Sequence, residues 1–333
     1  MTAVIAEAAG PAEPAGPTPS TSPAAPGPTG RGRIVLARLL AARWAVAGLV
    51  VVLLLFLLAF GGELLTPWDY ATPDYGALRQ PPSGTHWFGT NGVGQDVFAQ
   101  TIRGLQKSLV IGLLVALFST VLASLVGACA GYFGGWTDRV LMFLVDLMLV
   151  FPSFLVITIV SPRLKGAGWL AFVLLLALFN WMITARVVRS MTISLREREF
   201  VRAAQFMGVR PLRIIARHIL PNVASFLIID ATIAVGGAVM SETALSYFGF
   251  GVKAPDVSLG TLLAAGTSEA PVFPWLFYFA AGLLVLFVLA VNLIGDGLRD
   301  ALDPTSDAAR RPRRSRADAR ARARAEKKKR TSA

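Results

Sequence analysis

The side chains that most often do chemistry in enzymes are scarce in this sequence. Cys129 is the single cysteine and lies in an apolar run, which excludes an intrachain disulfide, and His86 and His218 are far apart. No zinc-ligand spacing, Ser-His-Asp set or Cys-His set is evident. The phosphate-binding pattern G-x-x-x-x-G-K-[ST] is absent too. We therefore expect no enzymatic activity, no metal and no cofactor on this chain.

Three acidic residues in or beside apolar runs are the remaining polar groups of interest: Asp146 (LVDLML), Asp230 (LIIDAT) and Glu242 (MSETAL). A charge at the centre of a bilayer costs about 2.5–3.5 kcal/mol on insertion scales, so such side chains face a protein interior or a cavity. Glu242 and Asp146 are our candidates for lining a translocation path. For Asp146 we favour the alternative, a helix–helix hydrogen bond or a position near a span end.

These acids lie in a chain that is too apolar for a soluble protein of its size. It has 333 residues, of which 54% are hydrophobic, and a mean hydropathy of +0.60. A span needs about 20 apolar residues. The sequence therefore predicts an all-α membrane protein with six transmembrane helices, at about Trp44–Phe60, Leu109–Ala130, Val140–Val160, Trp169–Thr184, Val223–Met240 and Val272–Ile294.

Orientation follows from the distribution of Lys and Arg, which favour cytoplasmic loops. Eight arginines lie between residues 186 and 217, whereas the segments on the other side hold few cations. We expect both termini, the turn near Asp138–Arg139 and the 186–222 segment to be cytoplasmic. Arg186 and Arg189 are interpreted as orientation charges.

The two ends of the chain differ from the middle. Residues 1–30 are rich in Pro, Ala and Gly, so we expect a disordered cytoplasmic tail. Residues 305–333 form a second tail. Within it, the stretch from Arg310 to Arg330 holds twelve Lys and Arg against two acids and supplies most of the net charge of +12. Beside a membrane span, such a tail favours contact with membrane lipids over nucleic acid. The permease-like part is expected at 31–304.

The segment 194–222 predicts two short amphipathic helices. Phe200, Ala203, Ala204 and Met207 form an apolar stripe on a helix that Gly208 ends. A second helix begins at Pro211, with the stripe Leu212, Ile215 and Ile219, and Pro221 redirects the chain. The physics leaves two alternatives open: a surface for a protein partner, or helices lying on lipid headgroups.

A family resemblance distinguishes between these alternatives. Ala203-Ala204, three residues, Gly208, eleven residues and Leu220-Pro221 resemble the cytoplasmic loop of permease subunits of ATP-binding-cassette importers. HWFGTNGVGQDVF, AGYFGGWTDRVLMFLVDLMLVFPSF, SLREREFVRAAQFMG, SETALSYFGFG and NLIGDGLRDALDP resemble the dipeptide/oligopeptide/nickel branch, in order over residues 34–304. The chain is similar to the subunit with the shorter first external loop. It departs at Arg202, where Glu is usual, and at His218, where Ile is usual.

The resemblance implies a type I importer permease fold in the cell membrane of a prokaryote. It implies a second homologous permease subunit, two ATPase subunits that bind ATP and Mg, and an external substrate-binding protein. It places ATPase coupling on the 194–222 segment; the residues concerned are Glu199, Phe200, Ala203, Ala204, Met207, Gly208, Leu220 and Pro221. Peptides are the expected cargo, with nickel or another small solute as the alternative.

Other interpretations of the sequence stay open. The long loop 61–103 either receives the binding protein or plugs the external mouth of its own dimer. A stand-alone secondary transporter or channel would use the 196–222 segment to bind lipid, but it would favour inverted repeats, and no duplication between the halves is evident. A membrane scaffold that binds soluble partners is the third interpretation.

Overall fold

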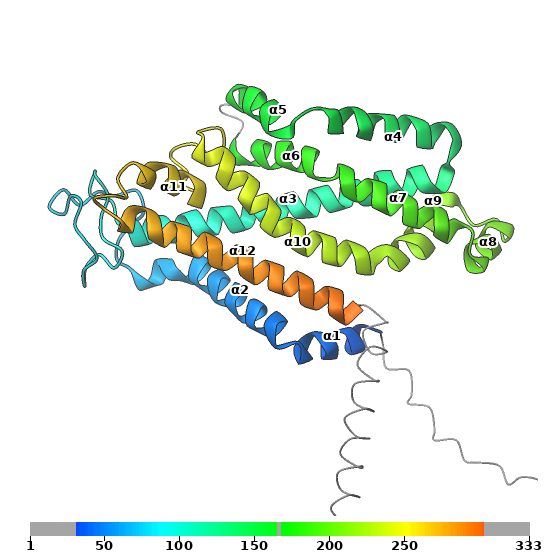
Figure 1. Ribbon diagram of the computed structural model, residues 1–333, viewed down its shortest axis with the longest axis horizontal. Coiled ribbons are helices and arrows are strands. Elements are labelled where there is room, and N and C mark those ends of the chain that lie inside the picture. Colours follow the sequence, from blue (N-terminus) through cyan, green and yellow to red (C-terminus); the bar gives the residue numbers. More distant parts are fainter. Residues whose placement is uncertain (1–30, 165–167, 303–333) are drawn as a thin grey trace, which may run out of the picture.

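The computed structural model describes residues 31–164 and 168–302, and the predicted tails 1–30 and 305–333 lie outside that range. The described part is a bundle of helices (Figure 1). In chain order the elements are α1 (Arg31–Ala41), α2 (Arg43–Gly61), η1 (Gly62–Leu65), α3 (Val97–Phe133), α4 (Gly135–Val150), α5 (Ser153–Val160), η2 (Ser161–Leu164), α6 (Gly168–Asn180), α7 (Met182–Arg196), α8 (Glu199–Phe206), α9 (Pro211–Ile214), η3 (Ile215–Ile219), α10 (Leu220–Tyr247), α11 (Leu259–Thr267) and α12 (Trp275–Leu302).

Four helical segments in the described part are long and apolar enough to cross a membrane: Arg43–Leu65, Val97–Phe133, Pro211–Tyr247 and Trp275–Leu302. Two further pairs of helices satisfy the same criteria together but are bent, α4 with α5 by 81° and α6 with α7 by 47°. The helices thus supply four spans, or six if each bent pair is one span. Each of the six predicted apolar runs lies within or overlaps one of these segments.

The two bends have local causes. Pro152 lies two residues after the last residue of α4, and proline has no N–H to donate to the preceding turn, so the helix ends at Val150 and restarts at Ser153. At the end of α6, Asn180 Nδ2 donates to the Leu176 carbonyl and Trp181 Nε1 donates to the Leu178 carbonyl, both at 2.8 Å. These side chains satisfy carbonyls that the next helical turn would otherwise use.

Two predicted boundaries were wrong. Asp138 and Arg139 lie inside α4 rather than in a turn, because the chain reverses earlier, at Gly134 and Gly135, which both have positive φ. Pro221 does not redirect the chain. It occupies the first turn of α10, where a missing N–H costs little, and the helical segment runs on from Pro211 to Tyr247 through the π-helical turn η3.

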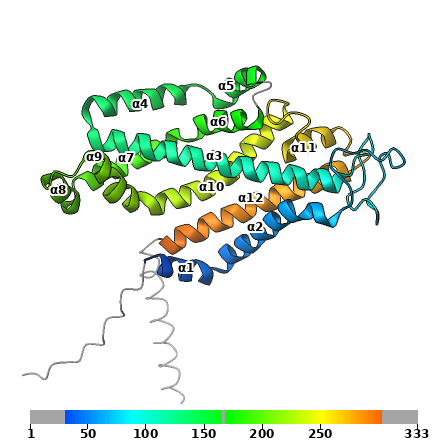
Figure 2. The ribbon, with the colours of Figure 1, turned by 180° about the vertical axis from the view of Figure 1, so that it is seen from behind.

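Helix α3 is the centre of the bundle, packed against α7 on one side and α10 on another. Glycine makes the close approach to α7 feasible: a Cβ on Gly127 would lie 2.4 Å from the Ala185 carbonyl oxygen, and one on Gly131 would lie 2.6 Å from that of Arg189. Helices α2 and α12 pack against each other beside this core (Figure 2). Buried Leu105, Leu109 and Phe287 belong to the cluster that joins them to α3.

The bundle has two distinct ends (Figures 1 and 2). The loop 66–96, α11 and the start of α12 lie at one end, called here the loop end. Helix α8 lies at the other, called the α8 end, and the described chain both begins and ends on that side, at α1 and the last turn of α12. The common side of the two described ends agrees with the predicted arrangement, while the orientation of the α8 end in a membrane stays a prediction.

Candidate functional site

Helix α8 is a two-turn helix held between two turns of the chain. Its N-terminal residue, Glu199, places an acid in the first turn, where the helix dipole favours negative charge. It ends before Gly208, whose φ of +73° is the left-handed conformation that glycine adopts without strain. The predicted end of the helix at a left-handed Gly208 is confirmed.

The inward face of α8 differs from the predicted stripe. Val201 and Ala204 are the buried residues, whereas Phe200, Ala203 and Met207 are exposed. Only Ala204 of the four stripe residues therefore packs inward. Val201 was missed because the apolar residues of this short helix cover more than half of its circumference. The pattern therefore does not show which apolar side is buried.

The outward face of α8 is unusually apolar for a surface that lies beyond the ends of the long helices. Phe206 is 90% exposed and Met207 is 75% exposed, with Phe200 and, from α9, Leu212 also exposed. We call these four residues the α8 surface. A patch of large apolar side chains rimmed by polar ones marks an interaction site. Here the rim is basic, since Arg198, Arg202 and Arg210 are exposed beside it.

Beneath the α8 surface, a buried cluster joins α8 to the membrane helices. The α8 core consists of Ala128 and Tyr132 of α3, Val188 of α7, Val201 and Ala204 of α8, and Ile214, Ile215 and Ile219 of the segment that leads into α10. Displacement of α8 is thereby resisted by three long helices at once, because closely packed interiors transmit strain.

Polar contacts reinforce this core at the end of α3. Arg196 donates through Nη1 to the Tyr132 carbonyl at 3.0 Å, and Gln205 donates through Nε2 to the Tyr132 hydroxyl at 3.3 Å. Tyr132 is thus a junction of α3, the end of α7 and α8. The predicted coupling residues Leu220 and Pro221 lie beyond the π-helical turn, half-buried and exposed respectively, rather than on the α8 surface.

Glu242 lies far from α8 along α10 and is fully buried. Its Oε2 accepts from Ser108 Oγ of α3 at 2.9 Å, and its Oε1 accepts from Ser246 Oγ at 2.6 Å. Ser108 Oγ in turn accepts from the backbone N–H of Leu259, the first residue of α11, at 3.3 Å. Glu242 therefore stands in a closed hydrogen-bond network between α3, α10 and α11, which we call the Glu242 network.

The other membrane acids contact α7. Asp146 of α4 pairs with Arg186, and Asp138 of α4 pairs with Arg189 through both carboxylate oxygens. Asp230 accepts from Thr184 Oγ1 at 2.8 Å. Arg186 and Arg189, interpreted from sequence as orientation charges, thus also tie α4 to α7, and Asp146 is a helix–helix partner in this conformation.

The structure therefore brings together Glu199, Phe200, Ala203, Ala204, Met207 and Gly208 and keeps Glu242 and Asp146 elsewhere. Sequence reasoning missed Phe206, Tyr132 and Gln205 on the α8 side. It also missed the serines around Glu242. Ser246 could have been found from its spacing four residues after Glu242, since such residues are neighbours on a helix. Ser108 could not, because it is 134 residues away in the chain.

At the loop end, side-chain contacts hold the loop 66–96 against the start of α3. Asp96 caps α3 by accepting from the Ala99 N–H at 2.7 Å, and its other oxygen is 2.8 Å from Nδ1 of buried His86. The His86 ring stacks on Trp68, with ring centres 4.5 Å apart. Arg79 reaches across to Glu269, beyond α11, at 3.2 Å. The loop 66–96 is therefore an ordered structure that covers the ends of the helices.

Comparison with known proteins adds independent findings. A family model described as "Binding-protein-dependent transport system inner membrane component" matches residues 119–307, and one described as "N-terminal TM domain of oligopeptide transport permease C" matches residues 30–82. The oligopeptide transport system permease protein OppC of Mycobacterium tuberculosis (strain H37Rv) is 57% identical over 282 residues, which cover 84% of this chain and 97% of the relative. The protein of that name from Bacillus subtilis is 34% identical over 260 residues, covering 78% and 85%.

Proposed function

This chain belongs to the family of binding-protein-dependent transport system inner membrane components, and we propose that it is the peptide-translocating subunit of an ATP-driven importer. Two relatives named oligopeptide permeases, each matching more than three quarters of this chain, support peptides as the cargo. Nickel or another small solute is the alternative that follows from the wider branch.

The observation that carries the proposal is the α8 surface together with the α8 core. Exposed Phe206 and Met207 offer a partner protein an apolar anchor, and buried Val201 and Ala204 connect that anchor to α3, α7 and α10. A cytoplasmic ATPase subunit fits this surface, because its movements would be passed through packed side chains to three spans. Glu199, Phe200, Ala203, Met207 and Gly208 would form or shape the contact.

The proposed cycle has no bond-making step on this chain. ATP and Mg bind on two partner ATPase subunits, whose closure pushes α8. The bundle of this chain and that of a homologous permease subunit then open their common path to each side in turn, and a binding protein delivers the peptide at the loop end. Glu242 and Asp146 would act by holding helices of this bundle in register.

Co-purification tests the proposal. The full-length chain, expressed with its neighbouring transport genes and solubilised in mild detergent, is expected to retain a pair of ATPase subunits. Replacing Phe206 and Met207 together by Ser should release them, because the apolar anchors are lost. The matched control replaces Leu64 and Tyr75, equally exposed at the loop end, and should release nothing. Persistent absence of any ATPase from the wild-type preparation would favour a stand-alone transporter or a scaffold.

A further inference from the structure

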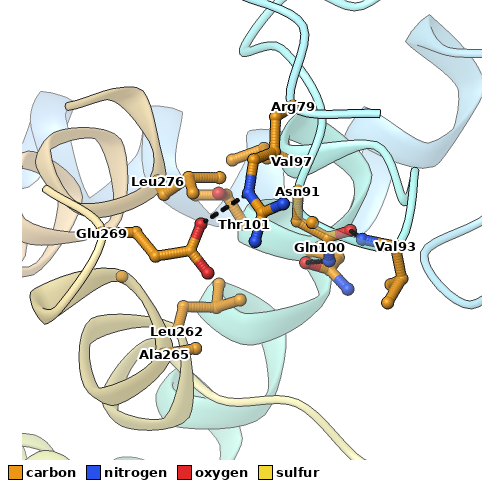
Figure 3. Close-up of a pocket in the computed structure, with 12 residues that line it drawn as sticks. Arg79, Asn91, Val93, Val97, Gln100, Thr101, Leu262, Ala265, Glu269 and Leu276 are labelled. Carbon is orange, nitrogen blue, oxygen red and sulfur yellow. Dashed lines mark hydrogen bonds and ion pairs between the residues drawn. The ribbon is translucent and has the colours of Figure 1, made fainter. Parts of the chain in front are cut away.

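A cavity of about 330 Å³ lies at the loop end, between the loop 66–96, the first turns of α3 and the helix α11. Its size falls within the range of small-molecule sites, about 300–1,000 Å³. The wall is mostly apolar, formed by Val93, Val97, Leu262, Ala265 and Leu276. Arg79 and Glu269 supply charged groups beside it (Figure 3).

The side chains of Arg79 and Glu269 are held in place, but each keeps hydrogen-bonding atoms without a partner in the described chain. Arg79 donates through Nε to Glu269 Oε2 at 3.2 Å, and its guanidinium carbon lies 5.5 Å from the centre of the Phe273 ring. Within residues 31–164 and 168–302, no group accepts from the Nη atoms of Arg79, and none donates to Oε1 of Glu269. The pair therefore keeps donors and one acceptor for a ligand.

The backbone around Arg79 is arranged to present this side chain. Arg79 has a φ of +50°, a conformation that costs a non-glycine residue free energy and that collects at ligand sites. Its N–H donates to the Asn91 carbonyl at 3.1 Å, which fixes the turn. Gly92 leaves room for the guanidinium, since a Cβ there would lie 3.0 Å from Nη2 of Arg79.

Thr101 borders the cavity but offers it no accessible polar atom. It lines the cavity from α3, is fully buried, and its Oγ1 has no hydrogen-bond partner within the described chain. Oγ1 has less than 1 Å² of accessible surface, so a group bound in the cavity does not reach this hydroxyl. Asn91 and Gln100 also line the cavity, but their side-chain amides are already bonded to each other and to Gln95.

We propose that this cavity binds the N-terminal residue of a peptide. An α-ammonium group and the first peptide carbonyl are neighbours on one residue, as Glu269 and Arg79 are neighbours here. The ammonium donates to Oε1 of Glu269, the carbonyl accepts from Nη of Arg79, and the first side chain lies against Leu262 and Leu276. This inference rests on the proposed function for the class of ligand. It adds a recognition site on the permease chain itself.

Binding of radiolabelled trileucine to the full-length chain in lipid nanodiscs tests the site. We expect saturable binding that weakens about tenfold for N-acetyl-trileucine and is unchanged for trileucine amide, since only the N-terminus is charge-paired. Free leucine shares the ammonium and an adjacent oxygen, and it should bind more weakly because it lacks the second residue. Leucine binding without trileucine binding would overturn the peptide assignment.

Variants complete the test. Glu269→Gln and Arg79→Gln should each weaken trileucine binding about tenfold. Glu269→Gln should also remove the difference between trileucine and its N-acetyl form, whereas Arg79→Gln should leave that difference, because Arg79 contacts a carbonyl that both peptides share. Glu63→Gln, in the other exposed ion pair of the loop end, is the matched control and should bind as the wild type does.

Three further outcomes would each be decisive. Equal binding of trileucine and N-acetyl-trileucine to the wild-type chain would overturn the site, whatever the variants do. Retention of the ATPase pair in a preparation that binds no trileucine would reject this site and leave the proposed function standing, whereas trileucine binding without any ATPase would do the reverse.

Discussion

Glu242 is a carboxylate that no solvent reaches, with both oxygens accepting from serine hydroxyls. Burying a charged or polar group is costly unless its hydrogen bonds are made. The Glu242 network meets this requirement with Ser108 and Ser246, and it fixes the start of α11 through the Leu259 N–H. At this scale Glu242 is best understood as a residue that positions α11 against α3 and α10.

Glu242→Ala should therefore destabilise the protein by about 2 kcal/mol or more, because it leaves the Ser108 and Ser246 hydroxyls buried without their acceptor. Thermal unfolding of the purified chain in detergent measures the effect. Glu242→Gln keeps one carbonyl oxygen and should cost less, and Glu63→Ala at an exposed site serves as the control. An unchanged midpoint for Glu242→Ala would show that the network does not hold the helices together.

Among the elements, α8 is the one whose two faces do different work. Its buried face belongs to the α8 core, and its exposed face forms the α8 surface. The angle at which it leaves the bundle is set at Gly208, since a left-handed residue there turns the chain from α8 toward α9. The position of α8 thus depends on this backbone conformation as well as on the α8 core.

Gly208→Val should impair peptide uptake strongly while leaving the membrane helices folded. A β-branched residue in the left-handed conformation costs at least about 1–2 kcal/mol, although nothing crowds the site sterically. Asn tolerates that conformation better, so Gly208→Asn should retain most of the uptake. Uptake of a labelled peptide by cells measures both.

Gly282→Val is the control for Gly208→Val. Gly282 lies in α12, where an added Cβ meets nothing within 4 Å and φ is not positive. If Gly208→Val transports and holds the ATPase as well as Gly282→Val does, the role given to α8 is wrong.

The whole molecule is polarised between its two ends. Exposed Phe206 marks the α8 end, and Tyr75, 79% exposed, marks the loop end. Both described chain ends lie on the α8 side. The eight arginines of residues 186–217 belong to α7 and to the segment between α7 and α10, which includes α8. The positive-inside rule then predicts that the α8 end is cytoplasmic.

Labelling of introduced cysteines tests this orientation. In a Cys129→Ser background, a membrane-impermeant maleimide should label Tyr75→Cys in intact cells and label Phe206→Cys only after permeabilisation. Removal of Cys129 leaves no other thiol in the chain. The reverse labelling pattern would invert the topology and would place the cavity at the loop end in the cytoplasm.

The sequence by itself determined the elements whose signal is local. A long apolar run that crosses a membrane must form a helix, because a helix makes the hydrogen bonds of all its backbone groups within the one segment. The runs at 44–60, 109–130 and 272–294 correspond to α2, α3 and α12. Gly208 was recognisable as a helix end because it lies between two short amphipathic segments, which became α8 and α9.

Only the tertiary structure decided what each side chain faces. Which side of α8 is buried depends on Tyr132 and Ile219, which come from other elements. Ser108, a partner of Glu242, and Glu269, the partner of Arg79, are each more than 100 residues away from the residue they contact. Periodicity reports the apolar side of a helix, but the neighbour that covers that side is fixed by packing between segments distant in sequence.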